Sequence, residues 1–323
     1  MKNKLLTLAS LLAAFNLNAI EIGPTGSGVE MSGFIDIQSS KQGDDTESTG
    51  AQVELNFGYS AGPVSAAVGL DFGAISAYGQ DTTTNNLEEA YVTYDFGNGF
   101  SATAGRMLTY MGFEAFDPTG MYQFSYAYDV QGAQDIYDAY DTGMSIDYSG
   151  DAFSVGVWSS LENEAGYELA LAYTGIENFT AKAIWSDFSS VTPDATVGAE
   201  ADPYEKSTFW ISYQLDKLLL AAEVAQKDSQ GLGSNGSDVE GMMIMANYAA
   251  TDSFAMTFRY SETEYETFDG AAVEYDGSKI TISPSYVFTD SLSGLLEYSS
   301  YSKDSGTTAE PEELIAAELI FTF

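Results

Sequence analysis

The 323-residue chain has no cysteine and no histidine, and only 11 of its residues are lysine or arginine. It therefore has no disulfide framework, no thiolate- or imidazole-held metal site, and no nucleophile of the Ser-His-Asp or Cys-His type. Its 48 acidic residues give a formal net charge of −37. A surface that follows nucleic-acid phosphates needs clustered bases, so we expect no nucleic-acid partner. We also expect the protein not to be an enzyme.

Long hydrophobic runs are missing too, apart from one short apolar segment at the N-terminus. Lys2 and Lys4 precede the apolar stretch Leu5–Phe15, and Ala19 ends a short run suited to cleavage. The stretch is too short for a spanning helix, which needs roughly 20 residues. Positive charge, a short apolar core and a small residue at the end are typical of a secretory signal peptide. We predict a signal peptide over 1–19 and a single exported domain over 20–323.

Alternation of apolar and polar residues runs through the rest of the chain. In the segment 52–59, Val53, Leu55, Phe57 and Tyr59 occupy every second position, and 167–174, 208–215 and 254–261 repeat the pattern. A period of two is typical of a strand with one apolar and one polar face. The pattern predicts about sixteen strands, near residues 29–38, 52–59, 63–73, 88–96, 100–107, 141–149, 152–160, 166–174, 178–186, 206–214, 218–226, 238–249, 253–261, 277–288, 291–302 and 312–323.

The connections between these strands alternate between short and long. The short ones, such as 97–99 and 215–217, are built from the Gly, Asn and Asp residues that tight hairpins favour. Aromatic residues of the apolar face flank these turns, as they do at a lipid–water boundary. Only a closed sheet satisfies its edge groups in hydrocarbon. The fold class we predict is all-β: a transmembrane antiparallel up-and-down barrel of about 16 strands.

Two parts of the sequence resemble known outer-membrane barrels. The chain ends in alternating apolar positions with Phe321 and Phe323, similar to the closing strand of Gram-negative barrels, which implies an assembly signal for the barrel-insertion machinery. The second part consists of the segments 104–107, 112–118 and 124–128. Their residues resemble those of the family called the putative β-barrel porins and, more distantly, those of the general porins. The resemblance implies an outer-membrane porin, in contact with lipid and lipopolysaccharide, that passes small hydrophilic solutes. It implies a homotrimer, with a monomer as the alternative.

The same resemblance makes 108–140, the third and longest of the long connections, an extracellular loop folded into the barrel as the pore constriction. Its acids are Glu114, Asp117, Asp129, Asp135 and Asp138. Alternation turns further charged residues toward the lumen: Glu54, Asp71, Asp95, Asp147, Glu168, Lys182, Glu223, Arg259 and Glu297, among others. Since acids far outnumber bases, we predict a water-filled channel that prefers cations.

Arg106 conflicts with this pattern, because alternation from Phe100 turns it toward lipid. The family resemblance instead implies an Arg106 that faces the pore, turned by a bulge at Gly105 and paired with Glu114 or Asp117. A place at the outer rim of the barrel is the other interpretation.

Two alternatives to a general diffusion channel remain open at this stage. Nine aromatic residues in 108–140 could line a sugar-selective porin, although such residues more often pack a loop against a wall. A plugged barrel with a structural or adhesive role is the second. We expect no cofactor; loosely bound Ca²⁺ or Mg²⁺ at carboxylate groups such as 44–47 or Asp135, Asp138 and Asp141 is a further hypothesis.

Overall fold

The computed structural model describes residues 19–44, 47–73, 86–114, 117–128, 136–137, 140–162, 166–188, 203–229, 237–267, 273–304 and 312–323. The predicted signal peptide falls almost wholly outside these ranges, as do Asp129, Asp135 and Asp138. Within the described ranges, no helix is long and apolar enough to cross a bilayer.

The described structure is built from strands. Their bounds are β1 Ile20–Glu21, β2 Val29–Gln42, β3 Ser48–Ala61, β4 Val64–Gly73, β5 Leu87–Gly97, β6 Phe100–Leu108, β7 Tyr140–Ser149, β8 Phe153–Ser160, β9 Tyr167–Tyr173, β10 Phe179–Asp187, β11 Tyr204–Leu215, β12 Leu218–Ser229, β13 Ser237–Ala249, β14 Phe254–Thr267, β15 Val273–Thr289, β16 Leu292–Asp304 and β17 Glu312–Thr322. A short 3-10 turn, η2 Pro118–Gly120, lies between β6 and β7.

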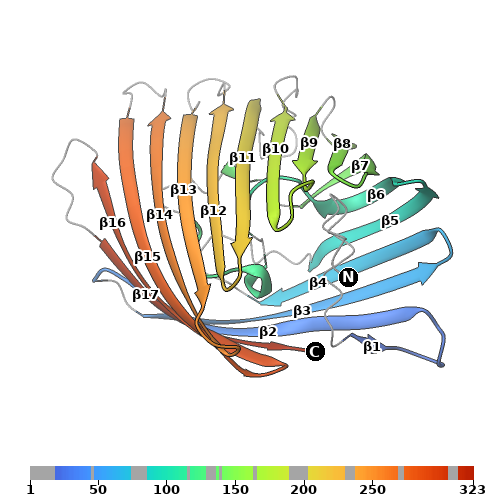
Figure 1. The fold of residues 1–323 in the computed structure, drawn as a ribbon, viewed down its shortest axis with the longest axis horizontal. Helices are drawn as coiled ribbons and strands as arrows, with labels where there is room; N and C mark the ends of the chain where they lie inside the picture. Colours follow the sequence, from blue (N-terminus) through green and yellow to red (C-terminus); the bar gives the residue numbers. More distant parts are fainter. Residues whose placement is uncertain are drawn as a thin grey trace.

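The strands close into a barrel (Figure 1). Each strand from β2 to β16 pairs antiparallel with the next, and β17 pairs back with β2, so that sixteen strands form one ring and β1 adds two residues beside β2. Closure leaves no row of unpaired backbone groups at an edge. The predicted fold class is confirmed, and each predicted strand corresponds to one of β2–β17. The pattern missed β1, because two residues are too few to show alternation.

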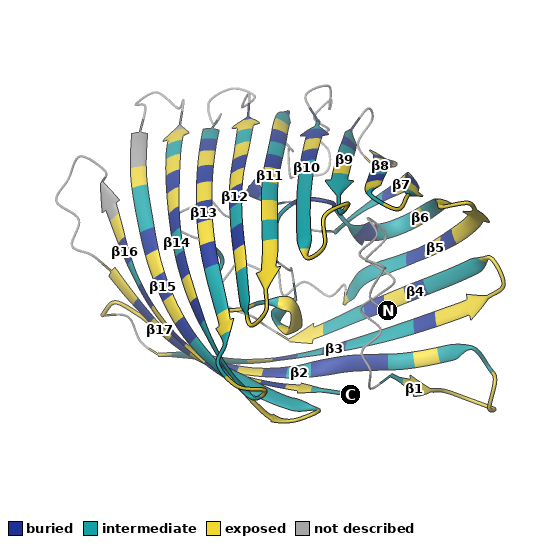
Figure 2. Cartoon of the chain, in the orientation of Figure 1, coloured by how far each residue is buried: buried dark blue, intermediate teal, exposed yellow. Residues whose placement is uncertain are grey.

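Burial alternates along the strands, as Figure 2 shows. The large apolar side chains point outward: Phe209, Val224, Ile244 and Phe258 are each about half exposed. Such a continuous apolar belt would be unfavourable in water, but it is what the hydrocarbon of a bilayer contacts. The opposite face of the same strands turns polar residues into the barrel.

The short turns carry the backbone geometry that their composition predicts. Asn98 and Asp216 adopt positive φ values of 55° and 50° in the turns after β5 and β11. Asn and Asp tolerate this left-handed conformation better than other residues with a side chain. The remaining connections at the other end of the barrel include 109–139, the segment between β6 and β7, which we call the third loop.

Candidate functional site

The described residues of the third loop lie inside the barrel. The main-chain N–H of Tyr110 donates to Glu168 Oε2 on β9 at 3.0 Å. Farther along, the N–H of Phe113 donates to Glu223 Oε1 on β12 at 2.9 Å, and that of Ser125 to Glu297 Oε2 on β16 at 2.9 Å. Because β9 and β16 are far apart around the ring, the loop crosses the lumen.

The beginning of the loop is held by Tyr110. Its hydroxyl donates to Asp147 Oδ1 on β7 at 2.6 Å, and its carbonyl accepts from Lys182 Nζ on β10 at 3.2 Å. Tyr110 and Met111 are also buried in an apolar cluster with Trp158 on β8. This wall thus provides both apolar and polar contacts to the loop.

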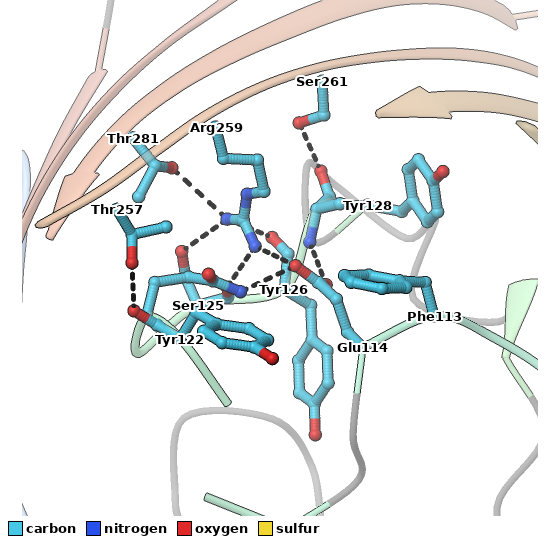
Figure 3. Close-up of polar contacts among 12 residues, drawn as sticks. Phe113, Glu114, Tyr122, Ser125, Tyr126, Tyr128, Thr257, Arg259, Ser261 and Thr281 are labelled. Atoms are coloured by element: carbon cyan, nitrogen blue, oxygen red, sulfur yellow. Dashed lines mark hydrogen bonds and ion pairs between the residues drawn. The ribbon is translucent and has the colours of Figure 1, made fainter. Parts of the chain in front are cut away.

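Arg259, on the inward face of β14, is the central contact of the loop (Figure 3). Its Nη1 pairs with Oε1 of Glu114 and donates to the carbonyl of Ser125 at 2.7 Å, while Nη2 donates to the carbonyl of Tyr126 at 3.0 Å. Both side chains of the ion pair are almost fully buried. Burial raises the pKa of Glu114, and the guanidinium of Arg259 acts against that shift. One side chain therefore fixes the loop at three residues.

Neighbouring side chains of β14 and β15 complete this contact. Lys279 Nζ donates to Ser125 Oγ at 2.6 Å and to the carbonyl of Tyr126 at 3.2 Å. Thr257 Oγ1 donates to the carbonyl of Tyr122 at 2.8 Å, and Ser261 Oγ to that of Ala127 at 2.7 Å. We call the strands that hold the loop, β7–β16, the anchored wall. Lys182 and Arg259, which alternation turned toward the lumen, and Lys279 all contact the loop there.

Most loop aromatics that the structure describes pack against the anchored wall. Tyr128 is buried over Gly241, where an added Cβ would lie 2.6 Å from the ring, and Tyr137 donates its hydroxyl to Glu223. Phe113 contacts Trp210 on β11 edge-on, with ring centroids 5.5 Å apart. The ring of Tyr126 points away from the strands that carry Arg259 (Figure 3). These contacts support the common role of such aromatics, which is to seat a loop.

The opposite part of the lumen carries carboxylates that no described lysine or arginine side chain contacts. We call this set the acidic arc; it lies on β17 and β2–β5 and consists of Asp36, Glu54, Asp71, Glu88, Glu89 and Glu318. Asp117 reaches it from the third loop, since oxygens of Glu54, Glu88 and Asp117 lie within 4.8 Å of one another. Burial, with a contribution from Asp71, raises the pKa of Asp117 to about 6.

Glu88 is a site residue that alternation missed. Gly69 on β4 lies opposite Glu89, but the next residue, Leu70, lies opposite Leu87, so Glu88 is the extra residue of a bulge in β5. A bulge of this kind turns two neighbouring side chains to the same face. Two consecutive glutamates therefore enter the lumen. The signal in the sequence was the pair Glu88-Glu89 at the start of an otherwise regular strand.

The structure does not bring Arg106 together with Glu114 or Asp117, and that expectation is corrected here. No register shift occurs at Gly105: Arg106 lies opposite Ala90 on β5 and Thr142 on β7, on the outward side of the sheet. Its Nε donates to the carbonyl of Glu88 at 3.0 Å. Because β6 stays in register, simple alternation described Arg106 correctly, and the partner of Glu114 is Arg259.

The other predicted residues are found as follows. Asp95 lies next to a short turn, exposed, and accepts from the N–H of Gly97 at 2.7 Å. Phe321 is 41% exposed on the outward face of β17, and Phe323 exchanges backbone hydrogen bonds with Gly33 on β2. Glu54, Asp147, Glu168, Glu223 and Glu297 are all buried on the inward face.

Comparison with known proteins identifies the class of this barrel. Residues 31–323 match the family model described as "Putative beta-barrel porin-2, OmpL-like", so the chain belongs to that family of porins. No curated protein sequence matches the chain.

Solved porin structures share the fold at low sequence identity. An anion-selective porin from Comamonas acidovorans is 13% identical, with a TM-score of 0.67, over 91% of this chain and 99% of that one. The outer-membrane channel DcaP of Acinetobacter baumannii is 12% identical, with a TM-score of 0.66, over 94% and 100%. OmpT of Vibrio cholerae in its trimer form is 14% identical, with a TM-score of 0.62, over 91% and 99%. The fold is therefore that of outer-membrane porins.

Proposed function

We propose that this porin is a water-filled outer-membrane channel for passive diffusion of small hydrophilic solutes, that it prefers cations, and that the third loop is its constriction. The observation that supports this most directly is the acidic arc. Its six carboxylates and Asp117 line one part of the lumen, while Lys182, Arg259 and Lys279 contact the loop on other strands. A lumen lined by one sign of charge concentrates the opposite ions.

The geometry of the third loop supports its role as the narrowest part. It contacts β9, β12 and β16 through main-chain N–H groups, so it occupies part of the cross-section between them. Arg259 and Lys279 fix it by short polar contacts in a buried environment. A fixed loop would set a constant size limit for solutes.

The other parts of the proposal follow from the class of protein. Residues 1–19 would direct export, and the outward apolar belt would contact lipid and lipopolysaccharide. A trimer is proposed because OmpT of Vibrio cholerae is recorded in a trimer form. The packing of Tyr128, Tyr137 and Phe113 against the wall favours a general channel over a sugar-selective one.

The test is planar-bilayer recording with the refolded mature protein in a KCl gradient, repeated after deletion of 112–138. We expect stepwise currents with a reversal potential that indicates cation preference, and a larger conductance after the deletion. Currents that prefer anions would overturn the proposed selectivity. A folded barrel without current in either form would identify a plugged barrel with a structural role, and a current blocked by maltodextrins would identify a sugar-selective porin.

A further inference from the structure

We propose that Glu54, Glu88 and Asp117 form a binding site for a divalent cation of the Ca²⁺ type, where the third loop meets the acidic arc. The three residues come from β3, β5 and the loop, and one carboxylate oxygen of each lies within 4.8 Å of the other two. Ca²⁺ lies about 2.3–2.6 Å from its oxygen ligands, so ligands on opposite sides of the ion are about 5 Å apart. The spacing of these three oxygens fits a single ion.

The state of Glu54 is independent evidence for a ligand. Its side chain is only 3% exposed, and Oε1 accepts from Asn56 Nδ2 at 2.5 Å. Oε2 is buried and accepts no hydrogen bond. A buried carboxylate oxygen without a donor costs free energy, and native proteins rarely leave one so. A bound cation would satisfy this oxygen.

The surroundings add oxygen and no positive side chain. Asp71 lies directly opposite Glu54 on β4, and Glu89 follows Glu88 on β5. Among the described residues, the nearest arginine by register is Arg106 on the outward side of β6, and it contacts the main-chain carbonyl of Glu88. Several carboxylates at one place repel one another unless a cation lies between them or one of them takes up a proton. Hard divalent cations prefer such oxygen ligands.

Gly69 keeps the space for this site open. It faces the lumen on β4, two residues before Asp71, where a Cβ would lie 2.7 Å from Cγ of Glu89 and 3.0 Å from Oδ1 of Asn56. A side chain here would displace Glu89 or Asn56, and Asn56 is the donor to Glu54. The bulge that adds Glu88 and the missing side chain of Gly69 lie at the same point of the β4–β5 pair. Together they gather carboxylates that regular alternation would have separated.

The site extends the proposed function but is tested without it, because binding is measured on the folded full chain with no current. We would titrate Ca²⁺ into the detergent-solubilised barrel by calorimetry and follow Tb³⁺ luminescence with Ca²⁺ as competitor. We expect one site per chain with a Kd of about 10⁻⁴–10⁻³ M, the range of extracellular calcium modules. If the protein binds Ca²⁺ but gives no current, the proposed channel function is wrong and the proposed binding site stands.

Two variants separate a built site from general attraction to an acidic protein. E54Q/E88Q should lose the site, with at least a tenfold weaker Kd. The control E240Q/E264Q removes the same charge from a directly paired position on the outward face of β13 and β14, and should bind as the unmodified chain does. Equal loss in both double variants, or no loss in E54Q/E88Q, would overturn the proposal.

A third variant leaves the net charge unchanged. G69A fills the space beside Glu89 without removing a carboxylate, and we expect Ca²⁺ binding to weaken several-fold. A barrel that folds as G69A, with unaltered heat-modifiable migration and unaltered Ca²⁺ affinity, would contradict the role given to this glycine and with it the geometry of the site.

Discussion

The anchored wall and the acidic arc face each other across one lumen, yet among the described residues only the wall carries basic side chains beside its carboxylates and the loop. On the anchored wall, Glu297 accepts from the N–H of Ser125, and Glu114 pairs with Arg259. On the arc, Glu54 and Glu318 each have a buried oxygen that accepts no hydrogen bond. Acids on the first side are structural, because they hold the loop. Acids on the second side are the ones that our proposals assign to ions.

This difference shows that the sign of the lumen charge is set by pairing as well as by composition. Lys182, Arg259 and Lys279 are all engaged where the loop is held. Had they been spread evenly, the carboxylates on both sides would be compensated. Among the described residues, concentrating them leaves the acidic arc without a basic side chain, as the proposed cation preference requires.

The largest effect is expected from breaking the anchored wall at Arg259. R259Q leaves Glu114 buried without its ion partner, and breaking a buried pair costs about 3–5 kcal/mol. We expect the free energy of unfolding in urea to fall by that amount and the third loop to become sensitive to protease. R106Q is the matched control on the outward face. If R106Q lowered the free energy of unfolding more than R259Q does, Arg106 would be the partner of Glu114, as the family resemblance implied.

Comparing one acid from each side should separate their roles. E297Q removes an acceptor of the loop and should lower the free energy of unfolding by about 1.5–3 kcal/mol, as loss of a charged hydrogen bond does. E318Q should leave stability unchanged or higher and reduce cation preference roughly threefold, the Coulomb effect of one charge about 6 Å from an ion in water. Unfolding and reversal potential are measured for both. Identical profiles of the two variants would show that the distinction between the two sides is wrong.

A smaller effect is expected where the loop packs by shape. In G241A, the new Cβ would lie 2.6 Å from the ring of Tyr128, and overpacking of this kind typically costs about 1–3 kcal/mol. The free energy of unfolding is the measurement. Y128F keeps the ring and loses only a long hydrogen bond of 3.4 Å to Glu223, so it should be milder. If Y128F were the more damaging change, the hydroxyl and not the packing would hold this part of the loop.

The smallest effect concerns a single neutral hydrogen bond to the loop. S261A removes the bond from Ser261 to the carbonyl of Ala127 and should cost about 1 kcal/mol. S278A, which removes an exposed bond to Ser302 on the other face of the barrel, should change the free energy of unfolding by much less. Equal losses would mean that the loop contact adds nothing beyond an ordinary surface bond.

Much of the fold was predictable because alternation is a local property. The apolar face of a strand can be read from alternation, as in Val53 to Tyr59 and in Phe254 to Tyr260. The places where strands reverse can be read from turn residues such as Asn98 and Asp216. The lumen position of Arg259 followed from parity alone. Its contact with Glu114, 145 residues away in the chain, could not be predicted in this way. Alternation shows which face of the strand a side chain is on, but it does not show which residue that side chain contacts.

The sequence by itself determined an acidic, all-β chain with sixteen amphipathic strands and a long third loop, since composition and a period of two act residue by residue. Only the tertiary structure decided that Glu88 enters the lumen through a bulge, that Arg106 stays outside, and that the loop is held by Arg259 and Lys279. These outcomes depend on register between strands and on which side chains meet across a closed ring. The chain has few basic residues, and the geometry of the closed barrel decides which carboxylates they can reach.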